Sequence, residues 1–72
     1  MKESTKKLIE AHLEKARTKH PKFAENHTHA VSIAAEEFGE WAQAVNDKDY
    51  EKAKQEAADL IAVIIRHIER DY

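Results

Sequence analysis

The stretch EEFGEWAQAVNDKDYEKAKQEAAD, residues 36–59, carries two acidic clusters on either side of a polar segment. The first cluster is EEFGE at 36–40, and the second is EAAD at 56–59. If the chain turns at Lys48, an antiparallel helix pair sets the two clusters level. At a rise of about 1.5 Å per residue, they then lie roughly 12 Å or more from the turn. The residues that share position 48 as their midpoint are Glu37 with Asp59 and Glu40 with Glu56.

Four carboxylates that converge on one small volume repel one another. Two unit charges about 4 Å apart repel by about 4 kcal/mol at an effective dielectric constant near 20, so the arrangement is costly unless a cation neutralises it. An all-oxygen ligand set suits hard cations, Mg²⁺ first and Mn²⁺ as a substitute. The sequence therefore predicts a metal site, whose expected ligands are Glu37, Glu40, Glu56 and Asp59.

The overall composition predicts a small, all-α, soluble protein. The chain has 72 residues, no cysteine, one glycine and one proline, and a formal net charge of -2. A single domain of this size buries little of its surface, and without disulfides oligomerisation is the remaining source of stability. No apolar run is long enough to cross a membrane, and the scattered basic residues argue against nucleic acid as a partner. We expect a cytoplasmic location.

Apolar spacing predicts three helices in a single domain over residues 1–72. Ser4 or Thr5 is expected to cap the first helix, and the bond between His20 and Pro21 to end it, because a residue that precedes proline avoids the α region. Asn26 or Thr28 is expected to cap the second helix. The expected helices cover residues 4–18, 28–46 and 49–70.

The second and third expected helices both carry apolar surface for packing, and in the third this surface exceeds what one neighbouring helix can cover. In the second helix an apolar row has the 3,4,3,4 spacing typical of a packing seam, and Trp41 on this row is expected to pack in a core. In the third helix, residues 60–65 are apolar around the full circumference. We therefore expect a homodimer or homotetramer. The seam consists of Val31, Ala34, Phe38, Trp41 and Val45.

Other interpretations of the acidic residues were weighed. Glutamate is common on solvated helix faces, so either cluster alone suits an ordinary surface. The joint pattern, with its symmetry about one turn and apolar neighbours, is harder to assign to solvation. A di-iron or di-manganese carboxylate bundle normally uses Glu-x-x-His on its helices, and this tetrad is absent from the sequence.

The pattern Glu-Glu-x-x-Glu followed by Glu-x-x-Asp on the next helix resembles the signature of the MazG-like all-α nucleoside triphosphate pyrophosphohydrolases. Here the pattern reads EEFGE and EAAD, and the resemblance covers roughly residues 20–70. It implies a three-helix protomer in an oligomeric helical bundle, and Mg²⁺-dependent hydrolysis of a nucleoside triphosphate to the monophosphate and pyrophosphate. The resemblance implies catalytic roles for Glu36, Glu37 and Glu40, with Glu36 assisting through a second metal or by orienting the attacking water.

The substrate pocket is less defined than the metal site. Members of this family carry a further element beyond the third helix, so either a neighbouring subunit completes the pocket or the protein binds nucleotide poorly. The alternative is a metal-binding helical interaction or regulatory module without turnover. The sequence leaves dUTP, dCTP and non-canonical nucleotides open as substrates, and His12 is interpreted as a core or interface histidine. Candidate substrate contacts are Phe23, His27, Trp41 and Lys52, with His29 beside them.

Overall fold

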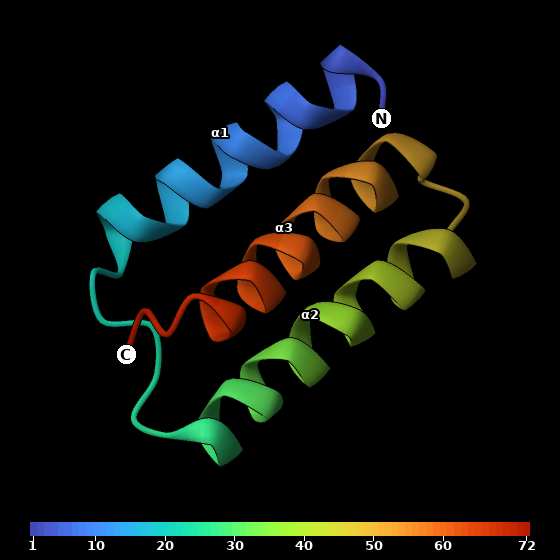
Figure 1. Ribbon diagram of the computed structural model, residues 1–72. Coiled ribbons are helices and arrows are strands. Elements are labelled where there is room, and N and C mark those ends of the chain that lie inside the picture. The colour runs from blue at the N-terminus through green and yellow to red at the C-terminus, as the bar shows by residue number, and fades with distance from the viewer.

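The computed structural model describes residues 1–72 as three helices joined by short connections, with no strand. The helices are α1 (Glu3–Lys19), α2 (His27–Asn46) and α3 (Tyr50–Ile68). Each helix bound lies within two residues of the range expected from the sequence. The chain is therefore all-α, and α3 is the central element, with α1 and α2 on either side of it (Figure 1).

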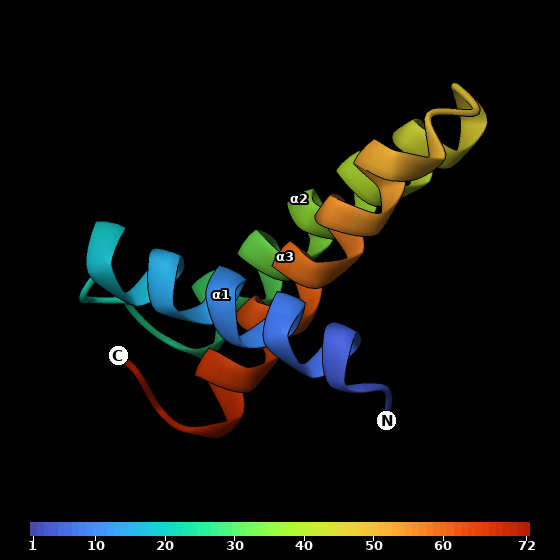
Figure 2. The same cartoon turned by 90° about the horizontal axis from the view of Figure 1, so that it is seen from above.

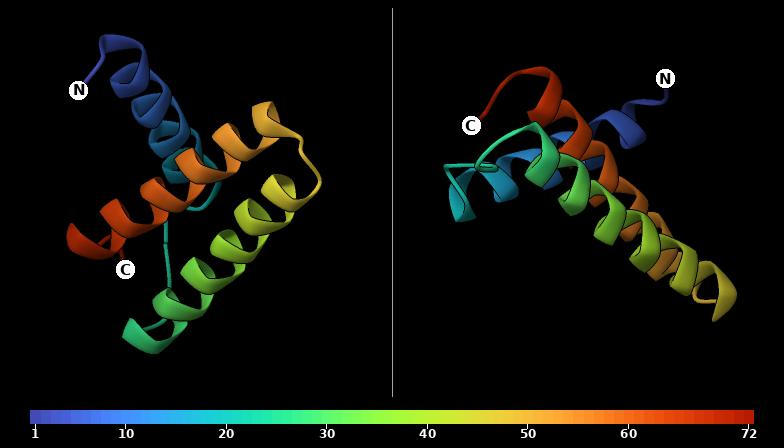
Figure 3. Two further views of the ribbon diagram at one scale, coloured as in Figure 1. Left: turned by 90° about the vertical axis from the view of Figure 1, so that its right-hand side faces the viewer. Right: turned by 90° about the horizontal axis from the view of Figure 1, so that it is seen from below.

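The three helices do not form a symmetric bundle. The antiparallel helices α2 and α3 run alongside each other, whereas α1 crosses α3 at an angle (Figure 2). Two further views show that α1 stays beside α3 and does not reach α2 (Figure 3). After α3 the chain returns to the connection between α1 and α2, where the Phe23 amide donates to the carbonyl of Asp71 at 2.8 Å. None of the helices combines the length and apolarity that crossing a bilayer requires.

The turn between α2 and α3 fixes their register. Lys48 has a left-handed backbone, with φ of 59°, and its amide donates to the carbonyl of Val45. The next amide, of Asp49, donates to the carbonyl of Ala44. These two bonds form a Schellman motif, in which a left-handed residue closes the end of a helix. The turn is therefore centred on Lys48, which is the midpoint in sequence between Glu37 and Asp59 and between Glu40 and Glu56.

Side chains cap two of the three helix starts. Asn26 accepts a hydrogen bond from the amide of His29 at 2.8 Å at the start of α2, and Asp49 accepts one from the amide of Lys52 at 3.1 Å at the start of α3. The expected capping of α1 by Ser4 or Thr5 is wrong, because α1 begins one residue earlier and its cap position is Lys2, whose side chain makes no capping bond. This helix start is exposed, so water can satisfy its free amides.

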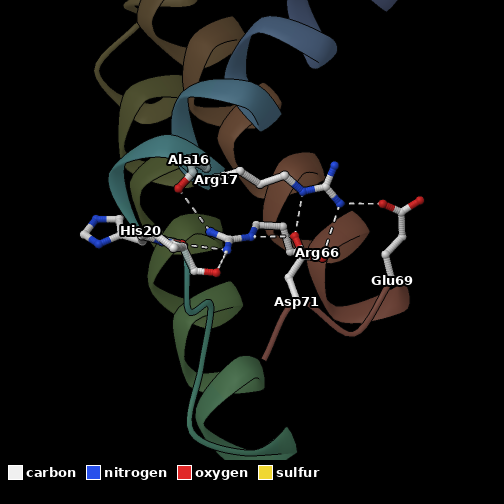
Figure 4. A network of polar contacts seen from close by, with 7 residues as sticks. Ala16, Arg17, His20, Arg66, Glu69 and Asp71 are labelled. Carbon is white, nitrogen blue, oxygen red and sulfur yellow. Dashed lines mark hydrogen bonds and ion pairs between the residues drawn. The ribbon is translucent and has the colours of Figure 1, made fainter.

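Arg66 joins α3 to the end of α1 (Figure 4). Its side chain is buried, and its guanidinium donates to the carbonyls of Ala16 at 3.1 Å, His20 at 2.6 Å and Pro21 at 3.1 Å. Its Nε donates to the Asp71 carboxylate at 3.0 Å. A buried guanidinium needs such partners for nearly all its donors. One arginine therefore holds the end of α1, the following connection and the C-terminal residues together.

Asp71 completes this junction with a second arginine. Its carboxylate also accepts from Nε of Arg17 at 2.6 Å, and Arg17 reaches Glu69 as well (Figure 4). The hydrogen bond from Arg17, followed by the one from Arg66, holds the pKa of Asp71 below its ordinary value despite partial burial. The last residues of the chain are thereby tied to α1.

The protomer has a small core that consists mostly of alanine. Phe23 is the only large apolar side chain that is buried, and its ring stacks on Tyr72 at a centroid distance of 5.8 Å. Ile33 and Val63 pack against the cluster that Phe23 forms with Ala24 and Ala30. Small side chains let helices approach closely but bury little apolar area, and area sets the hydrophobic stabilisation. The other buried apolar residues are Ala44, Ala53, Ala58 and Ala62.

The apolar seam predicted for α2 does not pack inside the protomer. Val31 is 65% exposed and Phe38 is 56% exposed, and Trp41, for which the sequence indicated a core position, lies at the surface with its ring edge-on to Phe38. The prediction fails because α2 meets α3 through its alanine and acidic side, including Ala30 and Ala44. On a helical wheel of 100° per residue, that side lies roughly a quarter turn from the seam.

A second apolar row remains exposed on α3. It consists of Ile61, Ile64 and Ile68, which lie on the opposite side of the helix from Ala62 and Arg66 beneath α1. Since α2 and α3 are antiparallel, the wheel turns this row and the α2 seam to the same flank of the helix pair, away from α1. The protomer therefore presents one broad apolar flank.

Replacing Lys48 with glycine should stabilise the protein. A side chain makes the left-handed conformation unfavourable by about 1 kcal/mol or more, and glycine avoids this cost at the price of extra freedom in the unfolded chain. We expect Lys48→Gly to raise the free energy of unfolding by up to about 1 kcal/mol in urea denaturation. Lys54→Gly, on an exposed helical position of α3, should lower it by a similar amount. A loss of stability in Lys48→Gly would contradict the described turn.

Candidate metal centre

Three carboxylates from α2 and α3 meet at the interface of these helices. Glu37 comes from α2, and Glu56 and Asp59 come from α3, where their i,i+3 spacing puts them on neighbouring turns of one side. One carboxylate oxygen from each residue lies within 4.8 Å of those of the other two. The turn at Lys48 creates this convergence, because it brings Glu37 level with Asp59. The protein thus has an acidic triad with the geometry of a possible metal site.

The acidic triad contains carboxylate oxygens without a partner. Oε2 of Glu37 and Oε2 of Glu56 are shielded from solvent, and neither accepts a hydrogen bond. Buried oxygens of this kind normally have a partner, since stripping one of water without replacement costs free energy. A cation held between the carboxylates would supply the missing interaction for both.

Glu40 adjoins the acidic triad without being one of its three members. Burial, followed by the negative charges of Glu40, Asp59 and Glu56, raises the pKa of Glu37 to about 7. Burial, and then a hydrogen bond with Glu40, also raises the pKa of Glu56. Glu40 itself is exposed to solvent. The expected four carboxylates are therefore close together, with three converging and one at the water-facing edge.

His12 of α1 also belongs to this site, and the sequence analysis did not place it there. Its Nδ1 lies 2.5 Å from Oδ1 of Asp59, and its Nε2 lies 2.8 Å from Oε1 of Gln55. Burial lowers the pKa of His12, but the hydrogen bonds to Asp59 and Gln55 outweigh this and raise it. A carboxylate has two oxygens, so Asp59 can accept from His12 and still bind a cation, an arrangement typical of metal-site outer shells.

A signal for His12 was present in the sequence. The residue lies among apolar positions of α1, including Leu8, Ile9 and Leu13, all half-buried in the structure. A polar side chain on such a face needs a hydrogen-bonding partner on the element it packs against. Periodicity could not identify that partner, because it gives the face of α1 but not which part of α3 the face meets.

The remaining residues proposed for catalysis or substrate contact lie around the acidic triad without joining it. Glu36 is exposed and makes no ion pair. Lys52 is exposed one helical turn before Glu56, and its charge partly offsets the rise in the pKa of Glu56 caused mainly by burial. Trp41 belongs to the exposed apolar flank. Their roles in binding or turnover remain predictions.

Two aromatic candidates lie near the C-terminal residues. The Phe23 ring is buried against Tyr72, with the Arg66 guanidinium 5.3 Å from its centroid, so it already has neighbours. His27 is exposed, and its Nδ1 lies 3.0 Å from the Tyr72 hydroxyl. Contact between either side chain and a base stays a prediction.

A cavity of about 580 Å³ opens beside the acidic triad between α1, the connection after it, α2 and α3. Glu37 and Asp59 line one part of it, and Phe23 and His29 line another. The volume lies in the range of small-molecule sites, about 300–1,000 Å³. The basic residues of its lining are His12, Lys15, Lys19, His20, Lys22, His29 and Arg66.

Comparisons with known proteins do not assign a family. No protein-family model matches the chain, and neither the search of curated proteins nor that of solved structures returned a similar protein. The function is therefore inferred from the residues of the acidic triad and from the cavity beside it.

The raised pKa of Glu37 predicts how stability depends on pH without metal. From about pH 4.5 to about 7 the folded protein holds a proton on Glu37 more tightly than the unfolded chain does, so this group's contribution to stability falls as pH rises. In Glu37→Gln this loss is absent. With a chelator present, the urea midpoint of the wild type should therefore fall relative to that of Glu37→Gln across this range. Parallel profiles of the two proteins would contradict the raised pKa.

Proposed function

We propose that the protein is a Mg²⁺-dependent nucleoside triphosphate pyrophosphohydrolase, which converts a nucleoside triphosphate and water to the monophosphate and pyrophosphate. The observation that carries the proposal is the acidic triad with its two unpartnered, solvent-shielded oxygens. The sequence resemblance to MazG-like enzymes names the reaction, and the cavity beside the acidic triad offers room for a small-molecule substrate.

The donor set fits a hard divalent cation. All three groups are carboxylates, and neither cysteine nor a histidine within the acidic triad favours a softer metal. Octahedral Mg²⁺ with bonds of about 2.1 Å places ligand oxygens about 3 to 4 Å apart. The oxygens within 4.8 Å of one another need only small side-chain movements to reach that spacing. Mn²⁺ has similar ligand preferences and is expected to substitute.

The proposed reaction forms a bond between a water oxygen and the α-phosphorus and breaks the bond to the oxygen that bridges to the β-phosphate. The bound cation supplies neutralisation of phosphate charge. Glu37, Glu56 and Asp59 hold it in place, and His12 orients Asp59. Glu40, exposed at the edge of the acidic triad, is the proposed acceptor of the water proton. Glu36, one helix position before Glu37, is proposed to assist.

A second candidate function is a metal-binding interaction or regulatory module without turnover. The observation that favours it is the apolar flank formed by the α2 seam and the α3 row, because contiguous exposed apolar surface marks sites of protein interaction. The two candidates differ in whether pyrophosphate is released. Both require the cation.

We also propose that the protein works as a homodimer or homotetramer through this flank. A core made mostly of alanine buries little apolar area, so a protomer of this size gains stability by covering the flank with another copy.

Pyrophosphate release and metal binding can be tested separately. With Mg²⁺ and a panel of canonical and modified nucleoside triphosphates, the wild type should release pyrophosphate and Glu40→Gln should not. Because a ligand at 100 times its dissociation constant stabilises the folded state by about 2.7 kcal/mol, saturating Mg²⁺ or Mn²⁺ should raise the melting temperature by several degrees.

The outcomes of this experiment separate the candidates. Equal release by the wild type and Glu40→Gln would count against the hydrolase. A melting shift without release identifies the module without turnover. If neither cation shifts the melting temperature of the wild type, the acidic triad is not a metal site. Glu51→Gln, which removes a carboxylate from an exposed part of α3, should keep the shift and serves as the control.

The oligomer prediction has its own measurement. At micromolar concentration, sedimentation velocity should give a species larger than one protomer. Ile64→Glu, which puts a charge in the middle of the exposed α3 row, should move the protein towards the monomer because a charge is costly to bury without a partner. A wild type that sediments as a pure monomer would contradict the prediction.

A further inference from the structure

Two lysines of α1 line the same cavity as Glu37 and Asp59. Lys15 and Lys19 are four residues apart, so they lie on the same side of the helix, about 6 Å apart along its axis. Neither side chain forms an ion pair within the chain, whereas Arg17 and Lys22 do. The cavity therefore has two ammonium groups without a counter-ion.

These lysines continue the side of α1 that reaches the acidic triad. His12 contacts Asp59, and Lys15 follows it by three residues on the same side of the helix. Lys19 follows by one more turn, at the end of α1. Along α1, the cavity thus runs from the acidic triad towards unpaired positive charge.

The end of a helix normally disfavours an anion, because its last carbonyls carry partial negative charge. Here Arg66 donates to the carbonyls of Ala16 and His20, where α1 ends. Two carbonyls at this helix end, those of Ala16 and His20, are thus bonded to a buried cation that offsets part of their negative charge, and Lys19 lies beside them.

The charges of the cavity lining suit a ligand with several phosphates. Lys22 and Arg66 of the lining are already paired with Glu25 and Asp71. The remaining lysine and carboxylate charges of the lining are Lys15 and Lys19 on one side and Glu37 and Asp59 on the other, so they balance, and a divalent cation at the acidic triad would leave the cavity positive. The chain as a whole has a net charge of -2. A polyphosphate can bind a cation through one phosphate and ammonium groups through the next.

We propose that Lys15 and Lys19 form a phosphate-binding subsite that holds the outer phosphates of a polyphosphate whose inner phosphate lies at the acidic triad. This inference rests on the proposed function, since it assigns the pyrophosphate that leaves in that reaction to α1. The chain contains a single glycine and therefore has no glycine-rich loop that could neutralise the leaving pyrophosphate. The two lysines would supply this neutralisation.

Isothermal titration with inorganic tripolyphosphate, in the presence of Mg²⁺, tests the subsite without relying on turnover. The double variant Lys15→Gln, Lys19→Gln should raise the dissociation constant between about threefold and thirtyfold, as for the loss of two solvent-accessible charge pairs. The control is Lys6→Gln, Lys7→Gln, which makes the same change in net charge on exposed positions of α1 outside the cavity. It should bind tripolyphosphate as the wild type does.

Titration with Mn²⁺ alone shows whether the Lys15, Lys19 variant binds tripolyphosphate more weakly because it lacks two charges or because its fold is damaged. Removing two ammonium groups near the acidic triad should leave Mn²⁺ affinity unchanged or raise it, whereas damage to the fold would lower it. Tripolyphosphate binding equal to that of the wild type, or weakened as much in the Lys6, Lys7 control, would overturn the subsite. A loss of Mn²⁺ affinity in the Lys15, Lys19 variant would overturn it as well, because the lysines would then be structural.

The same variants distinguish the subsite from the proposed function. If the protein releases no pyrophosphate from any nucleotide but binds tripolyphosphate through Lys15 and Lys19, the hydrolase proposal fails and the subsite stands. If it hydrolyses nucleotides and the double variant keeps the wild-type KM, the subsite fails and the hydrolase stands.

Discussion

Carboxylate repulsion at the interface between α2 and α3 is the constraint around which the rest of the structure is arranged. Glu37 and Glu56 sit where an ordinary helix pair would place apolar side chains, and each has an oxygen shielded from water without a partner. The helices can remain packed there without metal because burial and mutual repulsion favour the protonated acids. The interface therefore lacks the packing energy that apolar side chains would contribute at these two positions.

The rest of the fold offsets the missing packing energy through alanine packing, helix capping and the hydrogen bonds of Arg66. Alanines bring the helices together, capping side chains at Asn26 and Asp49 fix where α2 and α3 begin, and the buried Arg66 joins three segments by hydrogen bonds. These interactions are directional and specify geometry, but they replace little of the hydrophobic stabilisation that a larger core would give. The apolar area that is not buried in the protomer belongs to the exposed isoleucines of α3 and the exposed aromatic residues of α2.

The sequence predicted the helices and the meeting of the acids, because both follow from local rules. Symmetry about Lys48 needs only a turn at that residue and a constant rise per residue, and both are present. It did not predict which side of α2 faces α3. Apolar periodicity favoured the side with Phe38 and Trp41, yet α2 presents its alanines and Glu37. Nor could periodicity place His12 against Asp59, since the crossing of α1 depends on distant contacts such as those of Arg66.

The attachment of α1 has a consequence for motion. Of the other two helices, α1 contacts only α3, and none of its residues is fully buried. Its side-chain hydrogen bonds and ion pairs to other parts of the chain are made by His12 and Arg17, and Arg66 donates to its Ala16 carbonyl. The α2–α3 hairpin, by contrast, joins two helices that follow each other in the sequence, and both contribute buried residues. α1 is thus the least buried of the three helices. Separation of α1 from the hairpin would remove His12, Lys15 and Lys19 from the cavity together, and Glu37, Glu56 and Asp59 would stay on the hairpin. The two walls of the cavity therefore belong to parts of the chain that differ in how extensively they are packed.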